Sequence, residues 1–536
     1  MGKTHRHTGG GLRFPIIFTL GLVVGLALLL ASAPLASAAP QDEPAKAAAV
    51  DPAPAPAPAP APEEADTSWD PWGCNACPPC ECENYPCCTC RKPAEPKCPT
   101  KYDNLRFREN WRPCLCKPRC EIDDWSDRLK GVSVAGRLWL NVGGQVRFRW
   151  ESWRGQGFGA AGPAADDSWM LGRFRLHADI HWGDNLRVFV EGVWADQWDT
   201  RELGARGIDI NRGDLLNAFV EYQHDIGANS AGGIWVGRHE LQEGQQRLVS
   251  PLDWANTRRT FQGAGAWWEK GGTYVNAFWT HPVTIEAESG DDWNEDVTFS
   301  GVNYRNTVMN CREWEAYFYR LERDAVGARV EQDRFTVGGL IDGKIANTRF
   351  DWGAEAAYQF GDMGNNDISA HMACVTFGWK PCVRHWDPRI GIGLDYASGD
   401  SDPLDGTAGT FNQLFPLAHK WLGHADVLAR QNLIAARIEA SVKPTDKLTL
   451  LAWFHGFWRA DTADAAYGVT GAAIRPPSGS TERALGTELD LMAAYKIDRH
   501  WKAFIEWAHF FTGDFFTTTG AGEDVDVVYL GIQGTF

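Results

Sequence analysis

Arginine is the residue type on which a chemical role for this chain depends. Along several stretches it recurs at every second position, and its guanidinium group suits carboxylates because it donates two parallel hydrogen bonds to them. Rings or ladders of such groups select anions in a pore. The arginines that this pattern places on one face of early strands are Arg147, Arg149, Arg173, Arg175, Arg187 and Arg238. They predict a pore lining that favours anions. The alternative is a neutralised wall of the kind that any water-filled barrel has.

Further charged residues precede and occupy a connecting segment, residues 241–259. Glu240 is expected on the inward face with the arginines, and Arg247, Arg258 and Arg259 follow it. We expect this segment to reach over a pore or to fold into it as a constriction. The alternative is a solvated loop that Trp254 and Phe261 anchor.

Carboxylates accompany these arginines and change in number along the chain. Glu151, Asp179, Glu191 and Glu221 lie among the early arginines, where they would hold the guanidinium groups extended. Later runs place Glu355, Asp395, Glu439, Glu488, Asp490 and Glu506 on the inward parity. One wall of the pore is therefore expected to be basic and the other acidic, which argues against a simple polyanion channel.

The elements that must carry these side chains are long strands. In residues 168–182, Arg173, Arg175 and His177 alternate with Phe174 and Leu176, so one face is polar and the other apolar. The run exceeds the usual strand of about 5–6 residues and suits a tilted membrane strand of about 9–11. Similar runs start roughly at residues 142, 168, 185, 214, 233, 260, 272, 297, 313, 334, 350, 367, 388, 430, 446, 485, 500 and 525.

The connections between these runs support a membrane barrel. Short, turn-like connections such as Gly183-Asp184 and Asp498-Arg499 alternate with long ones such as 398–429 and 459–484. Outer-membrane barrels have short periplasmic turns and longer outer loops. Only the connection between Gly361 and Asn366 is short where a long one is due. We therefore predict an all-β fold, an 18-stranded antiparallel transmembrane β-barrel in residues 131–536.

The amino-terminal part predicts export. Residues 1–38 have a basic start, an apolar run and an Ala36-Ser37-Ala38 cleavage site, as a signal peptide does. Residues 39–70 form a Pro/Ala-rich linker, and residues 71–130 a small periplasmic module rich in cysteine. The net charge of −17 argues against a general nucleic-acid binder.

Eleven cysteines gather within that module, and two kinds of site are open for them. An exported chain favours disulfides, whereas the C-x-x-C-x-x-C spacing at its start could hold zinc or an iron–sulfur cluster. We expect disulfides, with one thiol of the odd number left over. The candidates are Cys74, Cys77, Cys80, Cys82, Cys87, Cys88, Cys90, Cys98, Cys114, Cys116 and Cys120.

Other site chemistry is weaker. Asp400, Asp402 and Asp405 could offer oxygen ligands to calcium, but they lack the EF-hand spacing and fit an ordinary turn. His455 and Ser441 share an inward face, yet no G-x-S-x-G string marks a nucleophile. We therefore expect no enzyme, no resident metal and no cofactor.

Several longer strings resemble the alginate-export family of outer-membrane porins, over about residues 137–536. They lie at residues 237–241, 247–261, 396–400, 409–416, 424–426, 430–432 and 486–490. The resemblance implies a monomeric 18-stranded barrel in outer-membrane lipid, with an arginine-rich lumen that passes a uronate polymer. A terminal Phe536 on an apolar strand face resembles the assembly signal of such barrels.

Together these features predict a porin for anionic sugars or polysaccharide in the cell outer membrane, with its amino-terminal region in the periplasm. The alternative is a structural barrel whose Pro- and Cys-rich arm tethers the cell wall or a periplasmic partner. No nucleic-acid partner is expected.

Overall fold

The computed structural model describes residues 99, 101–116, 122, 124–227, 229–307, 312–327, 329–345, 348–383 and 385–536. The chain divides into two compact units, Met1–Asp66 and Thr67–Phe536, and all described residues belong to the second. The expected signal peptide, the Pro-rich linker and most of the cysteine block lie outside the described residues.

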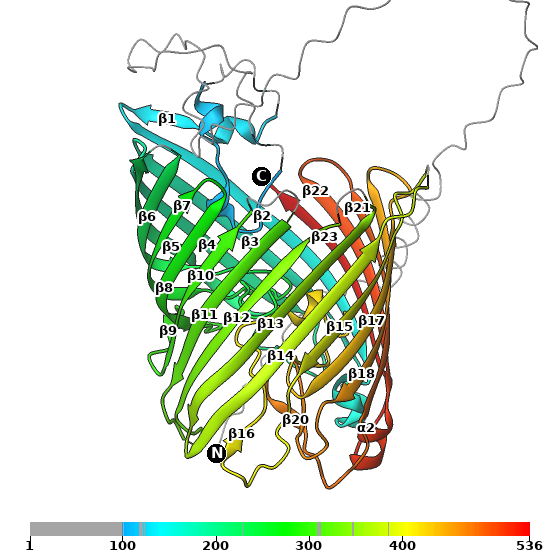
Figure 1. Cartoon of the computed structure of the whole chain (residues 1–536). Helices are drawn as coiled ribbons and strands as arrows, with labels where there is room; N and C mark the ends of the chain where they lie inside the picture. Colours follow the sequence, from blue (N-terminus) through cyan, green and yellow to red (C-terminus); the bar gives the residue numbers. More distant parts are fainter. Residues whose placement is uncertain are drawn as a thin grey trace, which may run out of the picture. The chain divides into compact units, whose positions relative to one another are not determined.

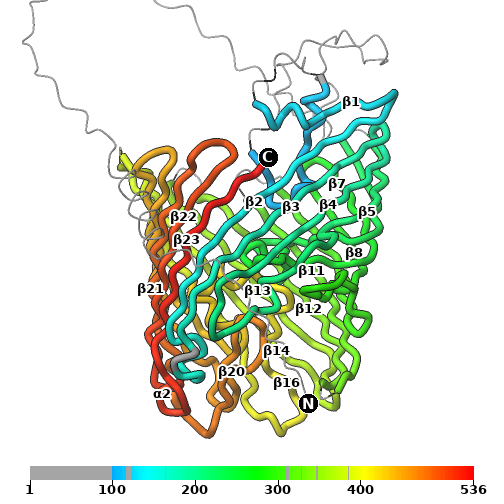
Figure 2. Tube along the Cα trace, turned by 180° about the vertical axis from the view of Figure 1, so that it is seen from behind, coloured from blue at the N-terminus to red at the C-terminus, as the bar shows by residue number. Residues whose placement is uncertain are grey.

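Eighteen long strands form one closed antiparallel barrel, which confirms the predicted fold class (Figures 1 and 2). Each strand pairs with its neighbours along the chain, and β23 pairs with β2 from Gln145↔Thr535 to Arg154↔Asp526, so that the sheet has no open edge. The strands are β2 (Leu138–Arg154), β3 (Asp167–Trp182), β4 (Leu186–Trp198), β5 (Asn211–Gly227), β6 (Ser230–His239), β7 (Phe261–Lys270), β8 (Thr273–Thr284), β10 (Val297–Asn306), β11 (Arg312–Arg323), β12 (Gln332–Lys344), β13 (Phe350–Met363), β14 (Asn366–Trp379), β15 (Arg389–Ala397), β17 (Leu433–Val442), β18 (Leu448–Arg459), β21 (Ala484–Lys496), β22 (Trp501–Thr512) and β23 (Val525–Thr535).

Short elements complete the described chain. They are β1 (Val132–Ala135), β9 (Asp292–Trp293), β16 (Thr407–Ala408), β19 (Ala466–Tyr467), β20 (Ala473–Arg475), α2 (Asp514–Thr519) and the 3-10 helices Arg106–Arg108, Arg112–Cys116, Asp127–Leu129, Gln156–Gly159, Gly162–Ala165 and Ala418–Lys420. Among the described residues, no helix is both long and apolar enough to cross a bilayer.

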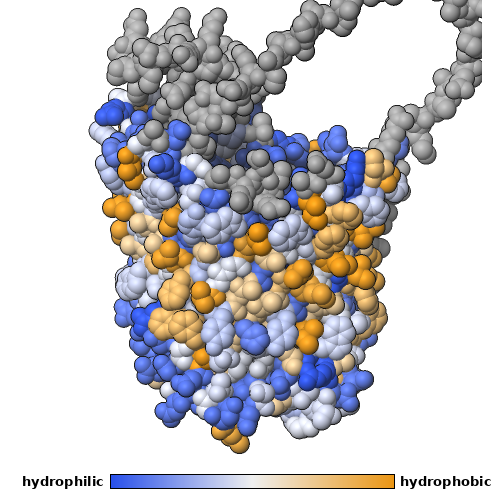
Figure 3. Space-filling model, in the orientation of Figure 1, coloured by the Kyte–Doolittle hydropathy of each residue, from blue (hydrophilic) through white to orange (hydrophobic). Residues whose placement is uncertain are grey.

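The two faces of the wall differ as the two-residue period requires. Along β3, Arg173 and Arg175 are buried inside, whereas Phe174 and Leu176 are 38% and 59% exposed on the outer face. Figure 3 shows apolar residues gathered around the middle of the wall and hydrophilic residues toward both rims. This outer band is the surface that a transmembrane barrel presents to acyl chains.

The two ends of the barrel differ in their connections. The carboxyl terminus and β1 lie at the end with mostly short turns, here called the short-turn end (Figure 1). The connection 380–388 is longer than its neighbours there. At the opposite end, β13 and β14 are joined by Gly364 and Asn365 alone, and Gly364 has a φ of +61°, a left-handed conformation that glycine adopts without strain.

Candidate functional site

Residues 240–260, which connect β6 to β7, fold into the barrel, and arginines of the wall hold their backbone. Arg147 donates hydrogen bonds to the carbonyl oxygens of Asp253 (2.8 Å) and Ala255 (2.7 Å). Arg173 donates to the Asp253 carboxylate (2.8 Å) and to the Ala255 carbonyl (3.0 Å). Both arginine side chains are buried. They anchor this segment, called inserted loop 240–260 below.

The tip of inserted loop 240–260 contacts a third arginine of the wall. Arg149 donates a 2.6 Å hydrogen bond to the Trp254 carbonyl, and its guanidinium carbon lies 4.2 Å from the centroid of the Trp254 ring. Burial would raise the pKa of Asp253, but the adjacent arginines, first Arg258 and then Arg173, hold it well below its usual value. Asp253 is therefore an ionised partner of the basic wall.

A series of buried charges fixes both ends of the same loop. Arg175 donates two hydrogen bonds of 3.0 Å to Glu191. The Asn217 amide donates 2.9 Å bonds to both Glu191 and Glu240, and Glu240 pairs with Arg258. Removal of one partner from a buried ion pair costs about 3–5 kcal/mol. These contacts therefore hold the loop firmly against β3, β4 and β5.

Much of a second segment, residues 398–432 between β15 and β17, also lies inside the barrel and packs on the first, whereas its residues 401–406 are exposed. Val249 and Phe415 form a parallel β-bridge, and the Ser250 N–H donates a 2.9 Å bond to the Phe415 carbonyl. Arg259 is partly buried and donates to the carbonyls of Ser250 (3.2 Å) and Pro416 (3.3 Å). The two segments form one packed body in the lumen; the second is called inserted loop 398–432.

The acidic wall binds the basic groups of both inserted loops. Arg247 of the first loop donates a 3.0 Å bond to Glu355 of β13. Arg430 of the second loop donates a 2.8 Å bond to Asp395 of β15. The expected asymmetry between a basic and an acidic wall therefore has a structural reason, because each wall holds loop groups of opposite polarity.

Residues 101–116 occupy the interior at the short-turn end. Phe107 is only 7% exposed, and its ring meets Phe189 and Phe219 edge-on, with centroids 5.8 and 5.4 Å away. Arg187 of β4 donates a 2.7 Å hydrogen bond to the Phe107 carbonyl. This stretch, called the mouth segment below, covers part of the lumen.

The mouth segment joins the barrel's carboxyl terminus to inserted loop 240–260. Arg106 donates to a terminal carboxylate oxygen of Phe536 (2.8 Å) and to the carbonyl of Gly144 (3.1 Å). Asn104 accepts a 3.1 Å bond from Arg258 of the inserted loop. The described interior is thus filled from both ends, and the two fillings meet at Asn104.

Lys130, just before β1, contacts the mouth segment. Its ammonium donates a 2.7 Å hydrogen bond to the Val142 carbonyl and lies 4.9 Å from the Trp111 ring centroid. Burial, with the nearby Arg106, lowers the pKa of Lys130 to about 7. The contact therefore responds to pH near neutrality.

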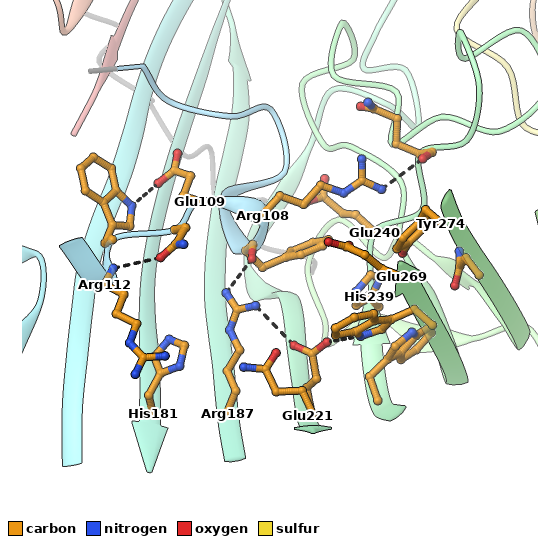
Figure 4. Close-up of a pocket in the computed structure, with 18 of the residues that line it drawn as sticks. Arg108, Glu109, Arg112, His181, Arg187, Glu221, His239, Glu240, Glu269 and Tyr274 are labelled. Atoms are coloured by element: carbon orange, nitrogen blue, oxygen red, sulfur yellow. Dashed lines mark hydrogen bonds and ion pairs between the residues drawn. The ribbon is translucent and has the colours of Figure 1, made fainter. Parts of the chain in front are cut away.

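A cavity of about 340 Å³ lies between the mouth segment, the start of inserted loop 240–260 and the wall formed by β2 to β8 and β10. Figure 4 shows Arg187 and Glu221 pointing toward one another below the part of the mouth segment that carries Arg108 and Glu109. The lining combines arginines, carboxylates and aromatic rings: Arg108, Arg112, Arg187, Arg305, Glu109, Asp184, Glu221, Glu240, Glu243, Glu269, Trp111, Trp139, Trp235, Trp267 and Tyr274. Such a lining can hydrogen-bond hydroxyl groups, pair with charges and stack on apolar ring faces.

The structure places Arg238 differently from the expectation. It shares the parity of Ile234 and Val236, which are 58% and 62% exposed, whereas Trp235 faces inward. Arg238 donates to the carbonyls of Leu215 and Asp291, each at 2.9 Å. The other early arginines that were expected inward lie on the inward face.

The aspartate loop is organised as a series of turns. Asp400, Asp402 and Asp405 each accept a hydrogen bond from the backbone N–H two residues later, as in ordinary Asx turns. Of the cysteines, Cys114 is disulfide-bonded, while Cys374 and Cys382 carry free thiols. Most of the cysteine block lies outside the described residues.

Sequence reasoning missed two contributors to the interior. The mouth segment has a weak signal, because Leu105 and Phe107 alternate with Arg106 and Arg108 in a short amphipathic run. Inserted loop 398–432 carries apolar residues, among them Leu422 and Leu428, that are buried in the structure. Such residues in a long connection are a signal for a loop that folds inward.

Comparisons with known proteins agree with this architecture. The family described as "Alginate export" matches residues 138–528. No curated protein matches the sequence. The solved structure of Pseudomonas aeruginosa OpdO is similar, with 12% identity and a TM-score of 0.50, covering 74% of this chain and 97% of that one. P. aeruginosa OccK5 (OpdH) has 11% identity and a TM-score of 0.50, covering 74% and 98%.

At these identities, the likeness to solved structures shows the barrel fold alone. The family match spans nearly the whole barrel, from its first long strand into its last. With the apolar outer band and the closed sheet, it identifies an outer-membrane channel. The chain belongs to the alginate export family.

Proposed function

We propose that this outer-membrane channel passes anionic sugars or polysaccharide of the uronate type, by diffusion, with the short-turn end in the periplasm. The cavity beside the mouth segment is the site where the cargo first meets the protein. The observation that carries this proposal is the combination of guanidinium groups and aromatic rings around that one cavity. The description of the family, alginate export, supports the same cargo class.

The chemistry of the cavity fits a uronate chain. A sugar ring has an apolar face that packs on an aromatic side chain, and its carboxylate pairs with arginine. Arg305 lies over Tyr274, with its guanidinium carbon 5.0 Å from the ring centroid. Arg108 is exposed and donates only to the Gln242 carbonyl, at 3.2 Å, among the hydrogen bonds of the described residues. These two arginines are the groups best placed to meet a carboxylate.

The wall arginines bind the inserted loop rather than the cargo. Arg147, Arg149 and Arg173 hold inserted loop 240–260, so the polymer does not meet their guanidinium groups while the loop stays in place. Passage then requires the mouth segment and the inserted loops to move aside. A periplasmic partner that binds residues 71–130 would be suited to move the mouth segment.

The proposal is tested by block of the channel in planar bilayers. Uronate oligosaccharides are added on the short-turn side of the full-length protein, and the concentration for half-block is compared with that of neutral oligosaccharides of equal length. We expect the Arg108→Gln/Arg305→Gln double variant to need at least tenfold more uronate, because a charge-assisted hydrogen bond contributes about 1.5–3 kcal/mol. The response to neutral sugar should not change.

The matched control is Arg349→Gln, an exposed arginine in the connection between β12 and β13 at the same end and outside the cavity lining. Equal block by charged and neutral sugars would refute the anionic cargo. An unchanged uronate response in the double variant would refute the cavity as its site.

A further inference from the structure

Three metal-ligating side chains meet in the barrel interior at the junction of the two inserted loops. His419 and His424 come from inserted loop 398–432, and Glu506 comes from β22; all three are buried, with ligand atoms within 4.8 Å of one another. Glu506 Oε2 lies 3.3 Å from His419 Nε2 and 3.2 Å from His424 Nδ1. Among the described residues, no other group of three such side chains brings its ligand atoms this close together.

The distances from the carboxylate to both imidazoles match a tetrahedral metal site. Zinc binds histidine nitrogen and carboxylate oxygen at about 2.0–2.1 Å, so two ligand atoms on a tetrahedral ion stand about 3.3 Å apart. The two imidazole rings are nearly parallel, at an angle of 14° and a centroid separation of 4.6 Å. Because a metal ion lies in the plane of each imidazole that binds it, one of the two rings must rotate to complete the geometry.

The groups around the cluster match those around a metal-binding histidine. Nδ1 of His419 lies 2.9 Å from Asp426 Oδ2, and its Nε2 is hydrogen-bonded to Glu506 Oε2 at 3.3 Å. A carboxylate on one ring nitrogen orients a metal-binding histidine, and an ion would take the place of the hydrogen bond between Nε2 and Glu506. His424 Nδ1 is buried and makes no hydrogen bond, although Glu506 Oε2 is close. A buried nitrogen without a hydrogen bond is costly, and a cation would satisfy it.

We propose that His419, His424 and Glu506 form a binding site for a divalent transition metal, with Zn²⁺ as the reference ion. Two imidazoles and one carboxylate suit zinc and its neighbours in the first transition row, whereas calcium prefers oxygen ligands alone. The ion ties inserted loop 398–432 to the wall at β22. Trp254 of inserted loop 240–260 stacks on His419 with centroids 3.6 Å apart, so the ion also steadies the first loop.

The test uses the full-length protein in detergent, stripped with a chelator and dialysed against Zn²⁺ alone. We expect Glu506→Gln and His424→Ala each to bind about one zinc ion fewer per chain than the wild type, by elemental analysis. The control is His509→Ala, a histidine on the same strand that faces outward and pairs with Asp526. Zinc held by cysteines would be common to all variants and cancels in the difference.

A second readout identifies the ligands. With Co²⁺ as the probe, the difference between wild-type and Glu506→Gln spectra should show visible bands of a tetrahedral nitrogen and oxygen site, without the thiolate charge-transfer bands of cysteine ligation. Glu506→Gln keeps the side-chain shape, and heat-modifiable migration on gels checks that it folds. Equal zinc content in wild type and both variants, or no cobalt difference spectrum, would overturn the proposal and leave a buried histidine–carboxylate ion cluster.

Discussion

Truncation of Phe107 to alanine should open the channel. Phe107 is 7% exposed and packs its ring against Phe189 and Phe219 inside the barrel. Truncation of a buried phenylalanine costs about 3–5 kcal/mol. Since about 1.4 kcal/mol corresponds to a factor of ten, the equilibrium constant for docking of the mouth segment should fall by two to nearly four orders of magnitude. The barrel itself should stay intact, because the lost contacts join the mouth segment to the wall.

Single-channel recording in planar bilayers measures this effect. The wild type should show low conductance with rare openings, because the mouth segment and the inserted loops fill the described interior. Phe107→Ala should show more frequent and longer openings, and limited proteolysis should cut the variant faster within residues 101–116. Both changes arise from the same loss of docking free energy.

The matched control is Phe148→Ala, a phenylalanine of β2 that is 37% exposed on the outer face. This variant truncates the same type of side chain at a position that does not contact the mouth segment. Equal opening frequencies in wild type and Phe107→Ala would refute the reasoning, as would an equal increase in Phe148→Ala.

Three further predictions concern the loops, pH and the barrel rim. Arg173→Met should leave Asp253 with fewer partners and raise amide exchange in inserted loop 240–260 at least tenfold, and exchange that stays at the wild-type rate would contradict the anchor. The pKa of Lys130 is about 7 while the mouth segment is docked and about 10.5 once that segment is released, so docking should strengthen from pH 7 to 10. The amide protection factors of the mouth segment should therefore rise with pH in the wild type and stay flat in Lys130→Met. Gly364→Ala should cost about 1–2 kcal/mol because residue 364 has a left-handed backbone, and a thermal midpoint at or above that of the wild type would count against this account of the turn.

The strands could be predicted from the sequence because a two-residue period is a local property. All eighteen begin within four residues of the expected positions, and the short β13–β14 turn lies where it was expected. Parity along each strand also placed Arg147 and Arg173 inside. It failed at Arg238, where the sequence alone does not say on which side of β6 the lumen lies.

The contacts inside the barrel could not be predicted in the same way, although residues 241–259 were expected to reach over the pore or fold into it. Arg173 and Asp253, or Arg430 and Asp395, are far apart in sequence, and nothing local shows that they pair. The sequence pattern of a charged residue on an inward face is the same whether its side chain contacts water, cargo or a loop. The cluster of His419, His424 and Glu506 likewise exists only once a loop reaches a distant strand.

The reversal potential of full-length channels under a salt gradient shows directly whether the channel carries anions. With uronate oligosaccharide as the main anion on one side, we predict a current carried by anions and a reversal potential displaced toward the anion equilibrium value. A cation-selective current, or no channel activity after correct insertion, would contradict an anion channel.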